Sequence, residues 1–373
     1  MTASPGTAKV AIVDQRCVIA RVVDFVRRFV FLKSEPMYLL VALWIIATHL
    51  HQSFRYTGYL FIQSPEKQCG KTRLLEILHL LVHNSTGIDS SPTAAVVSRT
   101  AWGNTQLLDE GDGWPELAGL RNILNAGFQR NAQTARCQQD GLGVQVPKKL
   151  LLYCPRAIAG IGKDILSGTT RDRTFFVDMA RQKPDERRER LRDKIVEPQA
   201  AELKKEVEEW VRNQREEVVT LYESLMQSSL PYLETFRDRT IDISEPLAVI
   251  LELAYRERRD DLSRARRDLC EAVALAREET NQYSEDHRVL AAIHELMAGS
   301  DMIEQPSALA KALNERAGIT LNEFLIADVL RRYGFEHKSV RKDSLPRKCY
   351  VIERSRLEDI LARYTSLPTT SQS

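Results

Sequence analysis

The stretch that decides the fold begins Gly58-Tyr-Leu-Phe-Ile-Gln63 and continues as Ser64-Pro-Glu-Lys-Gln-Cys-Gly-Lys-Thr72. Its first part is a short β-rich run, which is typical of a buried strand. After the polar loop, residues 71–83 place apolar side chains at helical spacing, as in a helix that packs on a sheet. A strand, a loop and a helix in this order predict an α/β unit.

The loop matches GxxxxGK[ST], except that Pro65 stands where the first glycine belongs. In such a loop, successive backbone N–H groups and the helix N-terminus hold a phosphate. Gly70 allows the backbone to come close, Lys71 reaches the β- and γ-phosphates, and Thr72 ligates Mg²⁺. The predicted ATP-binding residues are Ser64, Pro65, Glu66, Lys67, Gln68, Cys69, Gly70, Lys71 and Thr72. The alternative is a capped helix after a polar turn that contains Gly-Lys-Thr by chance.

A second predicted strand, at 104–108, ends in an acidic pair, Asp109-Glu110. Beside a phosphate loop, Asp109 would bind Mg²⁺ through water and Glu110 would polarise the attacking water. The pair therefore indicates ATP hydrolysis, with Lys71 and Glu110 as catalytic residues. By itself, an acidic strand end also fits an ordinary turn.

Further strand and helix patterns extend this unit, and they are followed by a densely charged segment and a second helical block. A helix at 115–128 and strands within 149–160 and at 174–179 predict a mostly parallel sheet. The charged segment 184–216 suggests a solvated helix. A second helical block, at 245–280, follows the start signal Ser244-Glu-Pro246.

The last section carries helical patterns at 285–298, 306–316 and 321–333, followed by β-like runs at 335–340 and 348–352. Three helices followed by a hairpin are the typical order of elements in a winged-helix domain. The predicted organisation is therefore N-terminal helices (1–55), an ATPase core (56–181), a helical domain (182–283), a winged-helix-like domain (284–365) and a disordered tail (366–373).

Several ordered motifs resemble the domain-of-unknown-function 3631 family of P-loop ATPases. They are Ser-Pro-Glu-Lys-Gln-Cys-Gly-Lys-Thr-Arg-Leu-Leu-Glu76, Leu-Leu-Asp-Glu110, Leu-Arg-Asn-Ile-Leu-Asn-Ala-Gly127, Pro-Arg-Ala-Ile-Ala-Gly-Ile-Gly162 and Arg-Asp-Arg173. The resemblance covers roughly residues 20–365. It implies an AAA-like or superfamily 3-like fold and a helicase-like ATPase of phages, plasmids or other mobile elements.

Arg171 and Arg173 precede the predicted strand at 174–179. In ring-forming ATPases similar to this chain, an arginine here reaches the γ-phosphate of a neighbouring subunit, and Arg173 is the favoured candidate. The alternative is an intramolecular ion pair with Asp172 or Asp178. Arg156 fits a sensor position or an ordinary surface position at a strand end. The implied assembly is a homo-oligomer, such as a hexamer.

Two basic segments are candidates for contact with DNA phosphates, without reading of base sequence. The first is a predicted hairpin at 133–147, with Arg136, Lys148 and Lys149, which also fits a structural connector. The second lies in 331–356, where nine basic residues face three acidic ones, a charge of 9 − 3 = +6. Its candidates are Arg341, Lys342, Arg347 and Lys348, and a solvated face or a protein-docking surface is the alternative.

Composition limits the other options. The 53 basic and 51 acidic residues give a net charge of +2, which argues against a uniformly basic nucleic-acid binder. The six cysteines form no CxxC pair, so neither a zinc site nor a disulfide framework is indicated. The apolar run 37–50 is too short to span a bilayer and predicts a buried helix. The start of the chain lacks a secretory signal, so we expect a cytoplasmic protein without a membrane partner.

Together these features predict an ATP- and Mg²⁺-dependent hydrolase that acts on DNA, as a helicase-like or replication-associated motor. The same loop would also serve a nucleotide-gated DNA-binding regulator or a defence-system ATPase without helicase activity. A small-molecule phosphotransferase is a third option, but the sequence shows no acceptor pocket.

Overall fold

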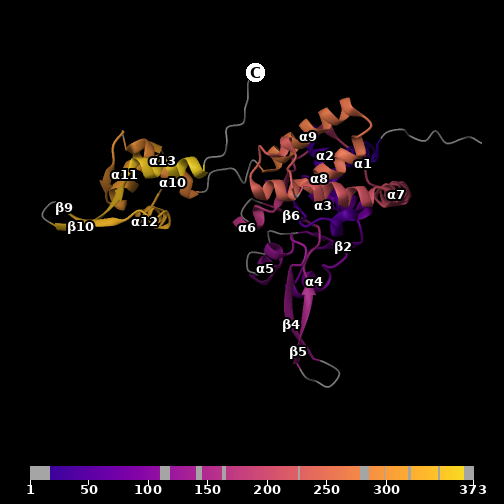
Figure 1. Ribbon diagram of the computed structural model, residues 1–373, viewed down its shortest axis with the longest axis horizontal. Helices are drawn as coiled ribbons and strands as arrows, with labels where there is room; N and C mark the ends of the chain where they lie inside the picture. The colour runs from indigo at the N-terminus through magenta and orange to yellow at the C-terminus, as the bar shows by residue number, and fades with distance from the viewer. Residues whose placement is uncertain are drawn as a thin grey trace, which may run out of the picture. The chain divides into compact units, whose positions relative to one another are not determined.

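The computed structural model describes residues 17–109, 118–139, 145–161, 165–225, 227–277, 285–297, 299–317, 321–342 and 345–364 (Figure 1). The chain divides into two compact units, Met1–Glu279 and Thr280–Ser373, which we call unit 1 and unit 2. Each unit has its own cluster of buried hydrophobic side chains.

Unit 1 is built on a five-stranded sheet with the strand order β2-β3-β6-β1-β7. The strands are β1 (Tyr59–Ser64), β2 (Ser85–Asp89), β3 (Thr105–Leu108), β6 (Arg156–Ile161) and β7 (Thr174–Asp178). Every neighbouring pair is parallel, so the predicted parallel sheet is confirmed. Parallel strands bring all their carboxyl ends to one edge of the sheet and all their amino ends to the other. We call these the C-terminal edge and the N-terminal edge.

Strand β1 lies inside the sheet, and all six of its residues are buried. Leu60 is in register with Ala157 of β6 on one side and with Phe175 of β7 on the other. A strand that is covered on both faces and paired along both sides is expected to be apolar throughout, and Tyr59-Leu-Phe-Ile62 meets that requirement. This burial fixes the point at which the following loop leaves the sheet.

The longer helices of unit 1 share the hydrophobic core with the sheet. They are α1 (Val18–Phe29), α2 (Glu35–Leu50), α3 (Lys71–Leu81), α7 (Asp193–Leu225), α8 (Asp238–Tyr255) and α9 (Arg259–Arg277). Helix α3 contacts β1, β3 and β6, and α9 contacts β7. The helices that follow residue 182 therefore contribute to the same core as the phosphate-loop strand.

Helix α2 is the predicted buried helix. Every residue from Met37 to Leu50 is buried, as expected for a helix that is apolar on all sides. The indole Nε1 of Trp44 donates a 2.7 Å hydrogen bond to the carbonyl of Gly58, which ties α2 to the start of β1. None of the helices in the described part of the chain has the length and apolar character needed to cross a bilayer.

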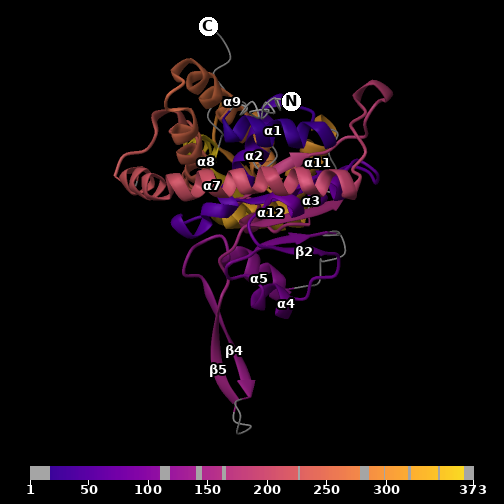
Figure 2. The ribbon, with the colours of Figure 1, turned by 90° about the vertical axis from the view of Figure 1, so that its right-hand side faces the viewer.

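Shorter elements complete unit 1. They are η1 (His51–Ser53), α4 (Ala94–Arg99), α5 (Ala118–Ala126), α6 (Gly168–Arg171), η3 (Pro184–Glu186), η4 (Pro231–Leu233) and the antiparallel hairpin of β4 (Gln133–Gln139) and β5 (Gln145–Leu151). The hairpin projects away from the helices of unit 1 (Figures 1 and 2). The predicted hairpin at 133–147 is present, and its second strand continues to Leu151 because Gln133 pairs with Leu151.

The charged segment differs from its prediction as a solvated helix over 184–216. Helix α7 begins at Asp193 and has one buried face. The buried side chains, spaced by threes, fours and a seven, are Val196, Ala200, Leu203, Val207, Val211, Val218, Tyr222 and Leu225. The dense charges concealed this stripe in the sequence, although its period is the ordinary helical one.

The second helical block also differs. It consists of two helices, α8 and α9, and Pro246 lies inside α8 rather than at its start. The helix begins eight residues earlier, at Asp238. Burial of neighbouring residues such as Ile243, Leu247 and Ile250 stabilises the helix. That burial offsets the backbone hydrogen bond that proline cannot donate.

The described part of unit 2 combines four helices with a three-stranded antiparallel sheet of order β8-β10-β9. Its elements are α10 (Glu285–Leu296), β8 (Met302–Glu304), α11 (Pro306–Ala317), α12 (Glu323–Arg332), β9 (His337–Lys342), β10 (Leu345–Ile352) and α13 (Arg354–Tyr364). The three predicted helices and the hairpin are present. Strand β8 and helix α13 were not predicted, because β8 is only three residues long and α13 is strongly polar.

Candidate functional site

The phosphate-loop sequence leaves the sheet at the C-terminal edge and leads directly into α3. Residues 65–68 are exposed, and Cys69 is buried beneath them. Two residues adopt positive φ angles, Gln68 at 64° and Gly70 at 91°. The angle at Gly70 lies in the region that glycine occupies without steric cost, which explains the glycine immediately before the helix. The loop therefore turns tightly around the N-terminus of α3.

Lys71 is folded back over the beginning of this loop. Its Nζ donates a 2.8 Å hydrogen bond to Oγ of Ser64, and that hydroxyl donates in turn to the carbonyl of Glu66, at 2.5 Å. The ammonium group thus lies beside the loop and is held by a single neutral hydroxyl. A more strongly charged acceptor, such as a phosphate oxygen, would compete effectively for it.

The acidic residue predicted for the site lies next to the predicted metal ligand. Oγ1 of Thr72 donates to Oδ2 of Asp109 over 3.3 Å. These residues are far apart in the sequence, and β6 lies between the strands that precede them. The N–H of Asp109 donates to the carbonyl of Asp89 at 2.9 Å, which extends the β2–β3 ladder and fixes the carboxylate at the C-terminal edge.

Sequence reasoning missed two further charged residues at this edge. Asp178, the last residue of β7, accepts a 2.6 Å hydrogen bond from the side-chain amide of Gln63, at the end of β1. Arg181 forms a 3.6 Å ion pair with Glu66 of the loop. The end of a predicted parallel strand next to β1 is a signal that could have identified Asp178, whereas Arg181 lies in irregular backbone that no pattern predicts.

These residues fit a magnesium-bound nucleotide. A hydroxyl and a carboxylate are the hard oxygen ligands that Mg²⁺ prefers, and this ion commonly keeps waters and phosphate oxygens in its remaining positions. Among the described residues, no group of three or more histidine, cysteine, aspartate or glutamate side chains could hold a metal ion unaided. Glu110, the predicted base, lies outside the described residues.

Arg173 lies at the opposite edge of the sheet. It precedes Thr174, which is in register with Tyr59 at the start of β1. At roughly 3.3 Å per residue, the five residues of β7 separate it from the phosphate-loop edge by about 16 Å. Its Nη1 donates to the carbonyl of Thr169, and its guanidinium carbon lies 4.6 Å from the ring centre of Phe128. Arg173 is therefore not brought together with Lys71 and Thr72 of the same chain.

Arg156 is neither a sensor at the phosphate loop nor a surface residue, so both sequence interpretations are wrong. It is 0% exposed at the N-terminal edge. Its guanidinium donates to Oε1 of Gln106, the hydroxyl of Tyr59 and the carbonyl of Leu152, at 2.8, 2.9 and 2.8 Å. A Cβ on Gly127 would lie 2.4 Å from this guanidinium, so glycine is required there. The burial follows from β6 lying inside the sheet, which a single sequence does not reveal.

The residues predicted to contact DNA lie on two separate hairpins. In unit 1, Lys148 and Lys149 are exposed on β5, and Arg136 of β4 is in register with Lys148. In unit 2, Arg341 of β9 and Arg347 and Lys348 of β10 are exposed. The side chains of Arg136 and Lys342 lie outside the described residues.

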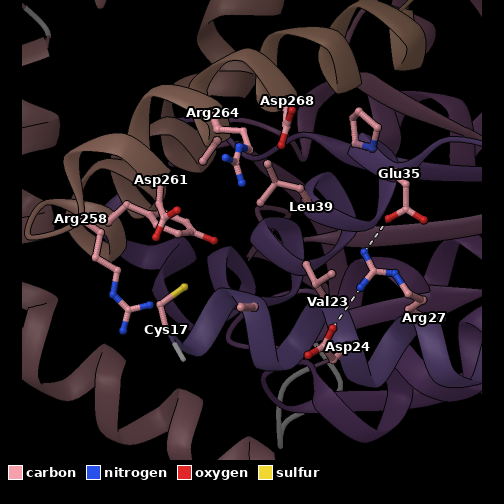
Figure 3. Close-up of a pocket in the computed structure, with 14 residues that line it drawn as sticks. Cys17, Val23, Asp24, Arg27, Glu35, Leu39, Arg258, Asp261, Arg264 and Asp268 are labelled. Atoms are coloured by element: carbon pink, nitrogen blue, oxygen red, sulfur yellow. Dashed lines mark hydrogen bonds and ion pairs between the residues drawn. The ribbon is translucent and has the colours of Figure 1, made fainter. Parts of the chain in front are cut away.

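A cavity of about 380 Å³ lies apart from the predicted site, between α1, α2 and α9 (Figure 3). Its charged side chains have both signs. Arg27 contacts Asp24 at 3.0 Å and Glu35 at 2.6 Å. Helix α9 contributes Asp261, Arg264 and Asp268, and Arg258 lies directly before it. Three arginines face four carboxylates, a net charge of 3 − 4 = −1, so the cavity has no strong preference for an anion or a cation.

Among solved structures, one described as "SCCmec type IV Cch - active helicase" is 13% identical in sequence, with a TM-score of 0.46 over 87% of this chain and 68% of that one. The apo A form of the NrS-1 C-terminal region is 10% identical, with a TM-score of 0.43 over 90% and 75%. A second structure of that region, residues 305–718, is 12% identical, with a TM-score of 0.41 over the same shares. The comparison with curated proteins gives no match.

The family model described as "Protein of unknown function (DUF3631)" matches residues 178–364, which is half of the chain. The matched span begins at the last residue of β7 and ends in α13. It therefore includes α7–α9 and the described elements of unit 2, and it starts after the phosphate loop and the other motifs quoted from the sequence. On this match, the chain belongs to the DUF3631 family.

Proposed function

We propose that unit 1 is a magnesium-dependent P-loop ATPase. The observation that carries the proposal is the 3.3 Å contact between the Thr72 hydroxyl and the Asp109 carboxylate. It lies beside a loop whose first residue, Ser64, accepts a hydrogen bond from Lys71. A helix-capping turn does not require a carboxylate from a strand two positions away in the sheet. A site for a phosphate-bound cation does, because it needs oxygen ligands on the side of the loop that faces the phosphates.

In this proposal the loop N–H groups and the N-terminus of α3 hold the phosphates. Lys71 exchanges its hydrogen bond with Ser64 for one with a phosphate oxygen. Thr72 and, through water, Asp109 hold Mg²⁺, which neutralises charge on the phosphate oxygens when it is bound. Glu110 keeps its sequence-based role of orienting and polarising the attacking water.

Arg173 belongs to the same proposal as a residue that acts on a neighbouring subunit. Its position at the N-terminal edge excludes contact with the phosphates bound by the loop of its own chain, so any action on a γ-phosphate is on that of a neighbouring subunit. This requires a homo-oligomer, such as a hexameric ring, in which the N-terminal edge of one subunit meets the phosphate loop of the next. An arginine in that position stabilises the negative charge of the transition state.

We further propose that the protein acts on DNA as a helicase-like motor. The exposed lysines of β5 and the basic hairpin of unit 2 provide sequence-independent contacts to phosphates. In unit 2 the hairpin follows three helices, and this order supports the winged-helix-like domain that we propose from the sequence. Hydrolysis in unit 1 would supply the work, and the two hairpins would hold the nucleic acid.

A nucleotide-gated DNA-binding regulator is the second candidate. It is favoured by the described residues, because Lys71, Thr72 and Asp109 would position phosphates and a cation without themselves activating water. A switch requires these residues and no sustained turnover. Processive unwinding of a duplex separates the motor from the switch.

The steady-state ATPase rate tests the proposal, measured against Mg²⁺ concentration with and without single- and double-stranded DNA. We expect Asp109→Asn to raise the Mg²⁺ requirement or lower the rate by about 10- to 100-fold, as for other residues that act on a metal through its water. Glu110→Gln should bind ATP and hydrolyse it poorly. Lys194→Ala removes an exposed charge of α7 and is the control. Equal rates in Asp109→Asn and Lys194→Ala, at limiting Mg²⁺, would count against the site.

Mixing two inactive variants tests the role of Arg173. Subunits with Arg173→Ala keep an intact phosphate loop, and subunits with Lys71→Ala keep an intact arginine. If Arg173 acts on a neighbouring subunit, mixed oligomers should recover part of the ATPase rate that neither variant has alone. No recovery, with mixed assembly verified by native mass spectrometry, would remove this role.

A further inference from the structure

A second cavity, of about 580 Å³, lies at the N-terminal edge of the sheet in unit 1. Four arginines line it, and we call it the four-arginine pocket. Arg55 comes from the segment before β1, Arg130 from the segment after α5, Arg173 from the residue before β7, and Arg239 from the first turn of α8. Four separate segments therefore bring the same side chain to one concave surface.

An aromatic pair, of which Phe128 lines the pocket, holds three of the guanidinium groups. Tyr56 and Phe128 are stacked with ring centres 5.5 Å apart and planes 9° apart. Arg55 lies 5.2 Å from the Tyr56 ring centre, and Arg173 and Arg239 lie 4.6 and 5.0 Å from that of Phe128. Because the guanidinium groups lie over the rings, the pocket offers N–H donors rather than free aromatic faces for stacking on a base.

The positive charge of the pocket is only partly balanced. Among the described residues that line it, none is acidic. Arg239 contacts Asp242 at 2.8 Å, outside the lining. Burial, and then the nearby charge of Arg239, lower the pKa of Arg173 from its usual value. The cavity in Figure 3 has a similar number of arginines, but these face carboxylates within the same cavity.

One donor in the pocket has no partner among the described residues. Nε of Arg173 is buried and makes no hydrogen bond, although Nη1 of the same guanidinium does. A buried charged donor without an acceptor is costly, so the protein does not fully satisfy the donors of this guanidinium. The planar arrangement of arginine donors matches the oxygens of a phosphate, and several arginines around one cavity concentrate the attraction for an anion.

We infer that the four-arginine pocket binds phosphate oxyanions that do not come from the nucleotide on the phosphate loop of the same chain. The separation of about 16 Å along β7 excludes that nucleotide. Two kinds of ligand carry such oxyanions, namely a nucleotide, through its phosphates, and a polynucleotide, through its backbone. Ala132, which lines the pocket, directly precedes the hairpin that carries Lys148 and Lys149, and a polynucleotide would extend along that hairpin.

The test uses the full-length chain carrying Lys71→Ala, so that the result does not depend on the phosphate loop. The probes are inorganic tripolyphosphate, followed by calorimetry, and a fluorescein-labelled 20-residue oligothymidylate, followed by anisotropy. Arg55→Gln, Arg130→Gln and Arg239→Gln are each added to this background. Arg212→Gln, an exposed arginine of α7, is the matched control.

We expect each pocket variant to weaken binding of at least one probe by about tenfold, and the control to change neither by more than about twofold. If the pocket variants lose affinity only for tripolyphosphate, the pocket binds a nucleotide. If they lose affinity only for oligothymidylate, it binds a nucleic-acid backbone. Both outcomes uphold the inference. Unchanged affinity for both probes in all three variants, or an equal loss in the control, would overturn it. Arg55 and Arg130 are exposed, so their variants keep the test valid if Arg239→Gln lowers the melting temperature.

Discussion

Charged residues at the edges of the parallel sheet in unit 1 are of two kinds, which differ in the number of buried partners that hold them. At the C-terminal edge, Lys71 and Thr72 are held by single contacts that a phosphate or a cation could replace. At the N-terminal edge, Arg156 is fully buried and bonded to three protein groups. The comparison teaches that a charged residue at a strand end is a candidate for ligand binding when its partners are few and exchangeable. With several buried partners it stabilises the fold.

The largest expected effect on stability is at Arg156. Substitution with methionine keeps most of the volume but leaves the buried oxygens of Gln106 and Leu152 without this donor. At about 1–3 kcal/mol for each unsatisfied group, with a further loss at Tyr59, we expect Arg156→Met to lower the free energy of unfolding by about 4 kcal/mol. Urea unfolding followed by circular dichroism measures this change.

Arg181→Gln is the matched control at the other edge. Arg181 and its partner Glu66 are both exposed, and such ion pairs contribute little. We expect a change of less than about 0.5 kcal/mol. If the two variants unfold at the same urea concentration, the distinction between a structural and an exchangeable arginine does not hold.

Acid should weaken unit 1 through two buried histidines near the N-terminal edge. Nε2 of His49 donates to the carbonyl of Leu81, and Nδ1 of His51 donates to that of Thr48, at 2.8 and 2.7 Å. Burial, as the largest cause, lowers the pKa of each to about 4. In the unfolded chain each pKa is about 6.5, so the unfolded state binds protons more readily between these values.

The contribution of the two histidines to the free energy of unfolding should therefore be fully present above about pH 6.5 and should decrease as the pH falls towards 4. We expect a loss on the order of 2 kcal/mol for each histidine between pH 7.5 and pH 5. The double variant His49→Phe with His51→Phe should have a shallower acid limb, whereas His79→Gln, at an exposed position, should leave it unchanged. An acid limb as steep in the double variant as in the wild type would contradict this assignment.

Much of the unit 1 fold and the core of its site could be predicted from the sequence, because both depend on local patterns. The strand at 59–64, the loop and the helix each have their own signal, and the rule that parallel strands end at one edge brings Asp109 to Thr72. The burial of Arg156 could not be predicted, because it depends on which strands lie inside the sheet. The four-arginine pocket is likewise built from four distant segments, and only Arg173 drew notice in the sequence.

The smallest expected effect concerns the hairpin that rises from the N-terminal edge. Lys148 and Lys149 are exposed on β5, and each would neutralise one phosphate. We expect Lys148→Gln and Lys149→Gln each to weaken DNA binding by a similar factor for all sequences, and to reduce the slope of log affinity against log salt by about 1. Anisotropy titrations over a range of salt concentrations measure this slope. An unchanged slope in both variants would leave the hairpin as a structural connector.

Calorimetry with MgATP tests most directly whether a nucleotide binds at the C-terminal edge. We expect saturable binding to the wild type and to Lys194→Ala, and no detectable heat of binding with Lys71→Ala, provided that all three have the same melting temperature. Equal affinity in Lys71→Ala and the wild type, or no binding to the folded wild-type chain, would contradict the account.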